Sequence, residues 1–245
     1  MSSAESGLTL GVDLGGTKIK TALVDSSGRV VDSKLFPTDS SRGADVVIQA
    51  IAESALRFLG GASPAKALGI GVAGQVDKTG TVRFAPNLGW TDVPLGSELR
   101  RVLGIPVVVV NDVRAAAWGE VQHGAGVGVE ELVCVFVGTG IGGGIVTGGR
   151  MLTGCTFAAG EIGHLTLVAG GRKCHCPNYG CFEAYVGGWA IADRAKEAAA
   201  ADPAAGSAMI SRAGSVDKIV GRTVSSSFHE GDQLATKIIE ETGKY

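Results

Sequence analysis

The chain opens with three short runs in which apolar and polar positions alternate. The runs span residues 8–14, 19–24 and 30–36, and they are separated by Gly15-Gly16-Thr17 and by a turn at 25–28. Alternation with a period of two, interrupted by glycine-rich and Asp-Ser-Ser-Gly turns, is typical of strands joined by tight turns. The pattern therefore predicts a three-stranded meander.

The period changes after this meander. Apolar residues recur at helical spacing over residues 43–59. Residues 67–73 and 107–110 are apolar runs of strand length, and residues 95–103 between them favour a short helix. A further helix is expected to begin at Val113.

The second half repeats the order of strands followed by helices. A strand is predicted over residues 131–138, and residues 143–147 and 164–168 continue the strand pattern. After Cys181 the pattern is helical to the last residue. This order predicts two α/β lobes. We expect an N-terminal lobe over residues 1–112 and a C-terminal lobe over residues 113–245.

Composition narrows the class of protein. The 245 residues suffice for two modest lobes, and 45% apolar with 19% charged residues is typical of a folded globular chain. The longest apolar stretches fall well short of the ~20 residues of a membrane helix, and residues 1–7 carry no export signal. A net charge of −2 without a Lys/Arg block gives no nucleic-acid footprint. We therefore expect a cytoplasmic protein that binds neither nucleic acid nor membrane.

Two of the glycine clusters follow predicted strands. The first is Asp13-Leu14-Gly15-Gly16-Thr17-Lys18, in which the glycines would let backbone N–H groups approach phosphate oxygens. Thr17 offers a hydroxyl donor, and the Asp13 carboxylate could orient the waters of a Mg²⁺ ion. An ordinary hairpin turn is the alternative interpretation.

The second cluster begins with Gly138-Thr139-Gly140 and continues to Gly144. It lacks the Gly-Lys-Ser/Thr ending of a Walker A loop. A strand rather than a helix follows it, unlike the dinucleotide-binding fingerprint. One such turn in each lobe would clamp a polyphosphate between the lobes, which is the arrangement of actin-like and hexokinase-like ATPases.

Three of the five cysteines, Cys174, Cys176 and Cys181, lie close together in the sequence. In a chain without an export signal this spacing favours a metal site over disulfides. Cys134 falls in a predicted strand and Cys155 in a loop region.

Six segments, in family order over residues 8–191, resemble the ROK family (repressors, open reading frames, kinases) and its glucokinases in particular. The resemblance implies an actin-like, ribonuclease H-like α/β fold with a sugar and ATP in the cleft between two lobes. It also implies an ATP- and Mg²⁺-dependent glucokinase of glycolysis and carbohydrate metabolism, and a homodimer. The segments are GVDLGGTK (11–18), NLGW (87–90), ND (111–112), GTGIGGG (138–144), GEIGH (160–164) and CHCPNYGCFE (174–183).

By this resemblance, Asp112 is the general base that accepts the proton of the sugar 6-hydroxyl as that oxygen attacks the γ-phosphate. Asn111-Asp112 also suit the N-cap of the following helix, and the two roles are compatible. Asn87 alone would be read as a turn residue, and Glu161 alone as a surface residue. The family's sugar-binding positions correspond to Gly74, Asn87, Asn111, Asp112, Glu161, His164 and Glu183, and the candidates for binding ATP are Asp13, Gly15, Gly16, Thr17, Lys18, Gly138, Thr139 and Gly140.

His164 joins the three clustered cysteines to give one imidazole and three thiolates, which suits tetrahedral Zn²⁺ and matches the family's zinc motif. Four protein ligands leave no open position, so this zinc would be structural and would hold Glu161 and Glu183 around the sugar. Pro177 stands where the family usually has glycine, and it removes one N–H. His175 as ligand in place of His164, free thiols and a redox disulfide are the alternatives.

The family's kinases continue beyond the point that corresponds to Tyr245, with a strand, a Gly-Gly turn that packs on adenosine and a closing helix. We therefore expect the second lobe of the chain as given to be incomplete, which puts adenosine binding in question. The alternatives are a sugar-binding remnant, a kinase for N-acetylglucosamine, N-acetylmannosamine, mannose or fructose, a kinase that uses polyphosphate, and a sugar-responsive repressor, for which residues 1–7 leave no room.

Overall fold

The computed structural model describes residues 7–60 and 65–245, and the remaining residues of the predicted N-terminal lobe lie outside the described part. The chain divides into two compact units. The first runs to Cys134 and includes Gly144–Ala159, and the second comprises Val135–Gly143 and Gly160–Tyr245. The predicted lobe boundary after residue 112 falls within the first unit and stays a prediction.

A five-stranded sheet is the centre of the first unit as far as its residues are described, in the order β3-β2-β1-β4-β8. β1 (Thr9–Leu14), β2 (Lys18–Val24) and β3 (Val30–Pro37) form the predicted antiparallel meander. β4 (Leu68–Val72) and β8 (Val107–Asn111) run parallel to β1. A meander beside parallel strands in this order is the ribonuclease H-like arrangement, so the predicted fold class is confirmed.

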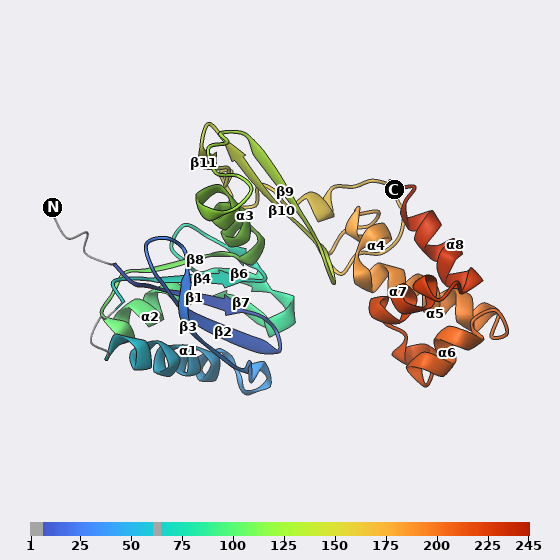
Figure 1. Ribbon diagram of the computed structural model, residues 1–245, viewed down its shortest axis with the longest axis horizontal. Helices are drawn as coiled ribbons and strands as arrows, with labels where there is room; N and C mark the ends of the chain where they lie inside the picture. Colours follow the sequence, from blue (N-terminus) through green and yellow to red (C-terminus); the bar gives the residue numbers. More distant parts are fainter. Residues whose placement is uncertain (1–6, 61–64) are drawn as a thin grey trace. The chain divides into compact units, whose positions relative to one another are not determined.

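Helices cover both faces of this sheet. Figure 1 shows α1 (Ala44–Leu59) and α2 (Leu95–Leu103) on one face and α3 (Asp112–His123) on the other. The fully buried Leu14 belongs to the large apolar core that also contains residues of α1 and α2. On the opposite face, Gly71 lets α3 approach β4, because an added Cβ would lie 3.2 Å from the Cα of the first residue of α3. The three predicted helices are confirmed.

A small antiparallel sheet in the first unit was not predicted. It consists of β5 (Gln75–Val76), β6 (Val82–Ala85) and β7 (Trp90–Val93), in that order. These strands are two to four residues long, and such short runs show no usable period. The 3-10 helix Pro86–Leu88 connects β6 to β7 and carries Asn87.

A three-stranded sheet contains β11 (Arg150–Met151), β10 (Ile141–Thr147) and β9 (Leu132–Val137), in that order. The strands predicted at 131–138 and 143–147 are therefore confirmed, and β10 begins two residues earlier than expected. Both β9 and β10 contribute residues to each unit.

The strand predicted over residues 164–168 is wrong. The 3-10 helix Ile162–His164 ends where the strand was expected to begin, and only an isolated bridge joins Thr166 to Cys181. Leu165 and Leu167 are both exposed. Their apolar pattern imitates a strand, but this segment has no ladder partner and leads into the cysteine-rich loop.

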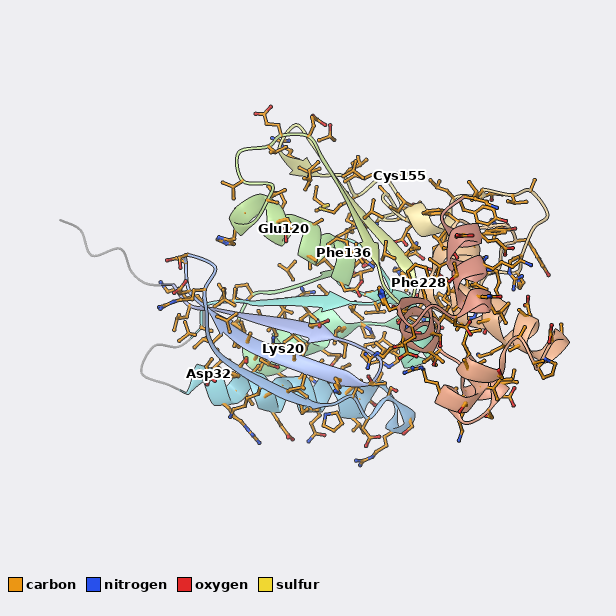
Figure 2. The ribbon with its side chains drawn as sticks, turned by 45° about the vertical axis from the view of Figure 1, so that its right-hand side comes forward. Lys20, Asp32, Glu120, Phe136, Cys155 and Phe228 are labelled. Carbon is orange, nitrogen blue, oxygen red and sulfur yellow. The ribbon has the colours of Figure 1, made fainter. Side chains whose placement is uncertain are left out.

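The second unit continues with helices α4 (Glu183–Val186), α5 (Gly188–Ala201), α6 (Ser207–Ala213), α7 (Gly221–His229) and α8 (Gln233–Thr242). The helical pattern after Cys181 is thus confirmed. Small residues of α5 pack with α6, α7 and α8 in one apolar cluster, against whose rim Phe228 of α7 lies (Figure 2). No helix in the described ranges has the length and apolar character needed to cross a membrane.

Candidate functional site

The first glycine turn joins β1 to β2 in the first unit. The Gly15 N–H donates to the Lys18 carbonyl oxygen at 3.1 Å, which closes the hairpin. From the end of β3, the buried Thr38 hydroxyl donates to the Gly15 carbonyl oxygen at 2.7 Å. A Cβ on Gly16 would lie 2.9 Å from the Asn87 carbonyl oxygen. The turn and Asn87 therefore lie directly against each other, and glycine is what allows this approach.

The polar candidates around this turn face solvent. Asp13, Thr17 and Lys18 are all exposed. In the sheet, Asp13 lies opposite Gly71 of β4. The carboxylate, the hydroxyl and the ammonium group are thus available to a ligand at this end of β1.

Asn111 and Gly74 meet where the parallel strands β4 and β8 end. Val72 pairs with Asn111 at the last position of the register. The Asn111 side-chain oxygen caps α3 by accepting from the Arg114 N–H at 3.1 Å, and its amide donates to the Gly74 carbonyl oxygen at 3.3 Å. A Cβ on Gly74 would lie 2.6 Å from the Phe84 carbonyl oxygen. The capping interpretation is correct for Asn111.

Asp112 is the first residue of α3 and is partly buried. Its Oδ1 accepts from the Val113 N–H at 2.9 Å. Burial raises the pKa of Asp112, the Asp13 carboxylate raises it further, and the Val113 N–H lowers it in part. A carboxylate with a raised pKa is a stronger proton acceptor than an ordinary aspartate. The site of the first unit therefore contains a side chain suited to the role of general base.

The second glycine turn, between β9 and β10, is held by backbone contacts within the second unit. The Gly138 N–H donates to the Gly140 carbonyl oxygen at 3.0 Å. The Gly138 carbonyl accepts from Gly188, and the Thr139 carbonyl accepts from Trp189, both at 3.0 Å. The first turn of α5 thus supports this glycine turn from behind, while Thr139 itself is exposed.

Glu183, the first residue of α4, holds the same turn with its side chain. Its Oε2 accepts from the Ile141 N–H at 2.7 Å, and its Oε1 accepts from the Trp189 indole N–H at 3.0 Å. A Cβ on Gly140 would collide with Oε2. The predicted sugar-binding carboxylate and the predicted phosphate-binding turn are therefore in direct contact.

The predicted metal ligands come together in the second unit. The ligand atoms of His164, Cys174, Cys176 and Cys181 all lie within 4.8 Å of one another. The Cys174 sulfur is 3.7 Å from His164 Nδ1, and the Cys176 and Cys181 sulfurs are 3.6 Å apart. Bonds of ~2.3 Å to sulfur and ~2.1 Å to nitrogen give tetrahedron edges of about 3.5–3.8 Å. The separations of 3.6 and 3.7 Å match these edges, one imidazole and three thiolates are a ligand set for four-coordinate Zn²⁺, and Nδ1 is the His164 nitrogen that contacts Cys174.

The protonation of the cluster depends on burial and on local N–H groups. Burial raises the pKa of Cys174 to about 12. Burial also opposes ionisation of Cys176, but the Asn178 N–H and the neighbouring thiols outweigh it and lower the pKa of Cys176. Although Pro177 has no N–H, the next residue, Asn178, donates its N–H to the Cys176 sulfur, so the loop keeps a donor for this thiolate.

The remaining cysteines and the neighbouring histidine lie outside the cluster. Cys134 is on β9, and Cys155 is exposed in the loop after β11 (Figure 2). The His175 ring stacks on Trp189 with 3.8 Å between centroids. His164, and not His175, is the imidazole placed with the cysteines.

Glu161 lies directly before the 3-10 helix that carries His164, whose N–H donates to the Glu161 carbonyl oxygen at 3.0 Å. The predicted sugar-binding residues are thus divided: Gly74, Asn87, Asn111 and Asp112 belong to the first unit, and Glu161, His164 and Glu183 to the second.

Two contributors were not predicted. Thr38 supports the first turn, and Trp189 supports the second. Thr38 is the first polar residue after the third predicted strand and carries no motif. Trp189 is one of three tryptophans and lies six residues after Glu183, a spacing that became informative only once α4 and α5 were known.

The chain is similar to known proteins over most of its length. The model of the ROK family matches residues 9–245. The glucokinase of Streptomyces coelicolor is 37% identical over 241 residues, which cover 98% of this chain and 75% of that protein. An N-acetylmannosamine kinase of Escherichia coli is 36% identical, with 96% and 75% covered. Among solved structures, a ROK family glucokinase from Streptomyces griseus in complex with glucose and AMPPNP has a TM-score of 0.80 and 40% identity, over 96% of this chain and 75% of that one.

These matches extend over nearly the whole chain, and the chain spans about three quarters of the length of these relatives. The glycine turns, the residue pair Asn111-Asp112 and the His/Cys cluster lie inside the matched range. The chain therefore belongs to the ROK family and is a sugar kinase.

Proposed function

We propose that the chain transfers the γ-phosphoryl group of ATP to the 6-hydroxyl of a hexose, with glucose as the preferred acceptor and Asp112 as the general base. The observation that carries the proposal is the position of Asp112, at the end of the sheet where β1, β4 and β8 also end and where the glycine turn follows β1. ATP as donor is supported by the AMPPNP bound to the Streptomyces griseus glucokinase.

Asp112 takes the proton of the attacking hydroxyl as the bond from that oxygen to phosphorus forms and the bond from the γ-phosphorus to the bridging oxygen breaks. Its raised pKa favours this transfer, because the ionised form is poorly stabilised by its surroundings. Asn111, fixed by its contacts with Gly74 and α3, would hold a sugar hydroxyl beside it. Phosphoryl transfer needs little covalent chemistry, so most of the rate would come from such positioning.

The two glycine turns would bind the phosphates through backbone N–H groups, with the Thr17 and Thr139 hydroxyls and the Lys18 ammonium group beside them. Asp13 would orient a Mg²⁺ ion, which neutralises charge that develops on the phosphate oxygens.

The His/Cys cluster would hold zinc with four protein ligands, so its role would be to fix the loops that carry Glu161 and Glu183. His164 would offer its other nitrogen to the sugar.

The acceptor is the finer part of this proposal. Discrimination between hexoses depends on a few hydrogen bonds, and the 36% identical relative is an N-acetylmannosamine kinase. N-Acetylmannosamine is therefore the second candidate acceptor. A homodimer is the assembly that we propose, and light scattering after gel filtration measures it.

The test is a coupled assay of sugar 6-phosphate formation with Mg-ATP or polyphosphate and a panel of hexoses. Glucose should give the highest kcat/KM. Asp112→Asn should lower kcat by more than about 100-fold. Asp32→Asn on the exposed strand β3 (Figure 2) is the matched control and should leave kcat unchanged.

Two results would contradict the proposal. Retention of more than about a tenth of the activity in Asp112→Asn would remove it as the base, because general-base catalysis contributes at least ~100-fold. The second result is a parent chain that has no kinase activity and whose melting temperature is raised by glucose but not by ATP. Such a chain would be a sugar-binding remnant.

A further inference from the structure

Two aromatic rings that the proposed reaction does not use stack on each other in the second unit. His175 lies between the cluster cysteines Cys174 and Cys176, and Trp189 lies in the first turn of α5. The ring centroids are 3.8 Å apart and the planes differ by 18°. Such a parallel stack contributes attraction beyond the area that it buries. It therefore ties the start of α5 to the His/Cys cluster.

Trp189 also reaches the glycine turn by two separate contacts. Its backbone N–H donates to the Thr139 carbonyl oxygen, and its indole N–H donates to Glu183 Oε1, each at 3.0 Å. The other carboxylate oxygen of Glu183 accepts from the Ile141 N–H at 2.7 Å. One residue thus contacts the loop of the cluster, the Glu183 carboxylate and the turn.

The indole N–H decides how Glu183 presents its charge. A carboxylate has about four acceptor positions. The Ile141 and Trp189 donors occupy two, which leaves the others for sugar hydroxyls. A free glutamate side chain samples several rotamers, and a rotated carboxylate would bring its charge to other parts of a turn that has to accept phosphate. Fixing the Oε1 side therefore keeps Oε2 on the Ile141 N–H and the remaining acceptor positions open.

We propose that Trp189 is a positioning residue. It holds the Glu183 carboxylate on the Ile141 N–H, and through its stack on His175 it makes the geometry of the glycine turn 138–140 depend on an intact His/Cys cluster. The kinetic consequence rests on the proposed function, whereas the effect on the turn does not. This role requires an indole side chain, because the indole combines an N–H donor with an aromatic face that can stack on His175.

The kinetic test uses Trp189→Phe, which keeps an aromatic ring for the stack and removes the N–H donor. Loss of a hydrogen bond to a charged group should lower kcat/KM for Mg-ATP about tenfold. Trp118→Phe, at a tryptophan that is 41% exposed on α3, is the matched control and should stay within about twofold. A Trp189→Phe enzyme as active as the control would overturn the proposal.

A second measurement does not need activity. Amide hydrogen exchange of a peptide that contains Ile141 should be about tenfold faster in Trp189→Phe than in the parent, because Glu183 no longer keeps its hydrogen bond. Removal of the metal with a chelator under reducing conditions should accelerate the same amide in the parent. Equal exchange in parent, variant and chelated protein would overturn the proposal.

His175→Ala separates the stack from metal binding. It should accelerate exchange at Ile141 while the protein still carries one zinc per chain, and a residue that served only the metal would not do this. If the parent is not a kinase but these exchange differences are found, the proposed function fails and the positioning role stands. If the parent is an active kinase but the exchange differences at Ile141 are absent, the proposed function stands and the positioning role of Trp189 fails.

Discussion

The two glycine turns look alike in sequence but are held in different ways. The hydrogen bonds that close the turn at 15–17 come from its own hairpin and from Thr38, directly after β3, so they lie within the next 23 residues of the chain. The turn at 138–140 depends on Glu183 and on the start of α5, more than 40 residues later. The first turn is therefore held by local hydrogen bonds and only packs against the distant Asn87, whereas the second is held by long-range hydrogen bonds that include a charged side chain.

The two turns also differ in the size of the apolar core beside them. The first lies on a sheet with a continuous core in which Leu14 and Ile19, on either side of the turn, are fully buried. The second lies beside a small cluster that contains Cys174, Cys181, Ala184 and Tyr185. A small apolar cluster contributes little burial, so a bound metal would have a larger share in the stability of the second region.

The largest change in stability is expected from removal of one metal ligand in the second region. Cys181 is fully buried, and Cys181→Ser should abolish binding of zinc and lower the free energy of unfolding by at least ~3 kcal/mol, a part of the ~10 kcal/mol or more that structural zinc contributes in small metal domains. Zinc analysis and urea unfolding under reducing conditions measure both. Cys155→Ser, at an exposed cysteine outside the cluster, is the control. A Cys181→Ser protein with one zinc per chain would show that the cluster is not the site.

Alanine substitutions at the two turns should separate stability from activity. Gly16→Ala brings Cβ to 2.9 Å from a backbone oxygen that cannot move aside, so it should lower the free energy of unfolding by ~1–3 kcal/mol. Gly140→Ala meets only the carboxylate of Glu183, which can turn away at the expense of its hydrogen bond to the Ile141 N–H, so it should cost less than Gly16→Ala, about 1 kcal/mol, and reduce kcat/KM for ATP.

Gly11 and Gly119, neither of which lies in a glycine turn, provide the controls for this pair, because an added Cβ at either position has no neighbour within 4 Å. Unfolding in urea and steady-state kinetics on all four variants make the comparison. If Gly140→Ala unfolds as readily as Gly16→Ala, the second turn is as rigidly built as the first, and the contrast between them is lost.

The same difference explains what could be predicted from sequence. The meander, α1, α2 and α3 follow from period and turn residues that lie within each element, so their first residues were predicted to within one position, although α3 extends beyond the predicted Gly119 to His123. The sheet β5-β6-β7 was missed because its strands are too short to show a period. Residues 164–168 imitate a strand, although the chain there is organised by the bridge from Thr166 to Cys181.

The site divides along the same line. The resemblance predicts Asp112 and the glycine turns as site residues, and the spacing of the motif predicts the four residues whose ligand atoms lie together in the cluster. The contact of Glu183 with Ile141 joins positions 42 residues apart, and the stack of His175 on Trp189 depends on the path of the loop between the cysteines. Neither leaves a periodic or spaced pattern in the sequence, so both required the fold.

A smaller effect is expected at the support of the first turn. Thr38→Val removes the buried hydroxyl that donates to the Gly15 carbonyl and keeps the shape of the side chain, so it should cost about 1 kcal/mol. Thr91→Val on the exposed face of β7 is the control. Urea unfolding measures the difference, and an unchanged midpoint for Thr38→Val would mean that the turn does not depend on the Thr38 hydroxyl.

The smallest effect has the opposite sign, and it concerns Asp112, the proposed general base. Because burial raises the pKa of Asp112, the folded chain binds its proton more tightly than the unfolded chain does. The free energy of unfolding therefore falls as the pH rises from the pKa that Asp112 has in the unfolded chain to the higher pKa that it has in the folded chain. Above that range the buried carboxylate charge destabilises the fold. Asp112→Asn removes this charge and keeps an oxygen for the Val113 N–H, so at pH 7 the inactive variant should melt at a higher temperature than the parent. Below the unfolded pKa both forms are uncharged and the difference should disappear. Thermal melts of the two proteins across this pH range test the argument, and a variant that is less stable than the parent at pH 7 would mean that Asp112 is needed as a charged cap on α3.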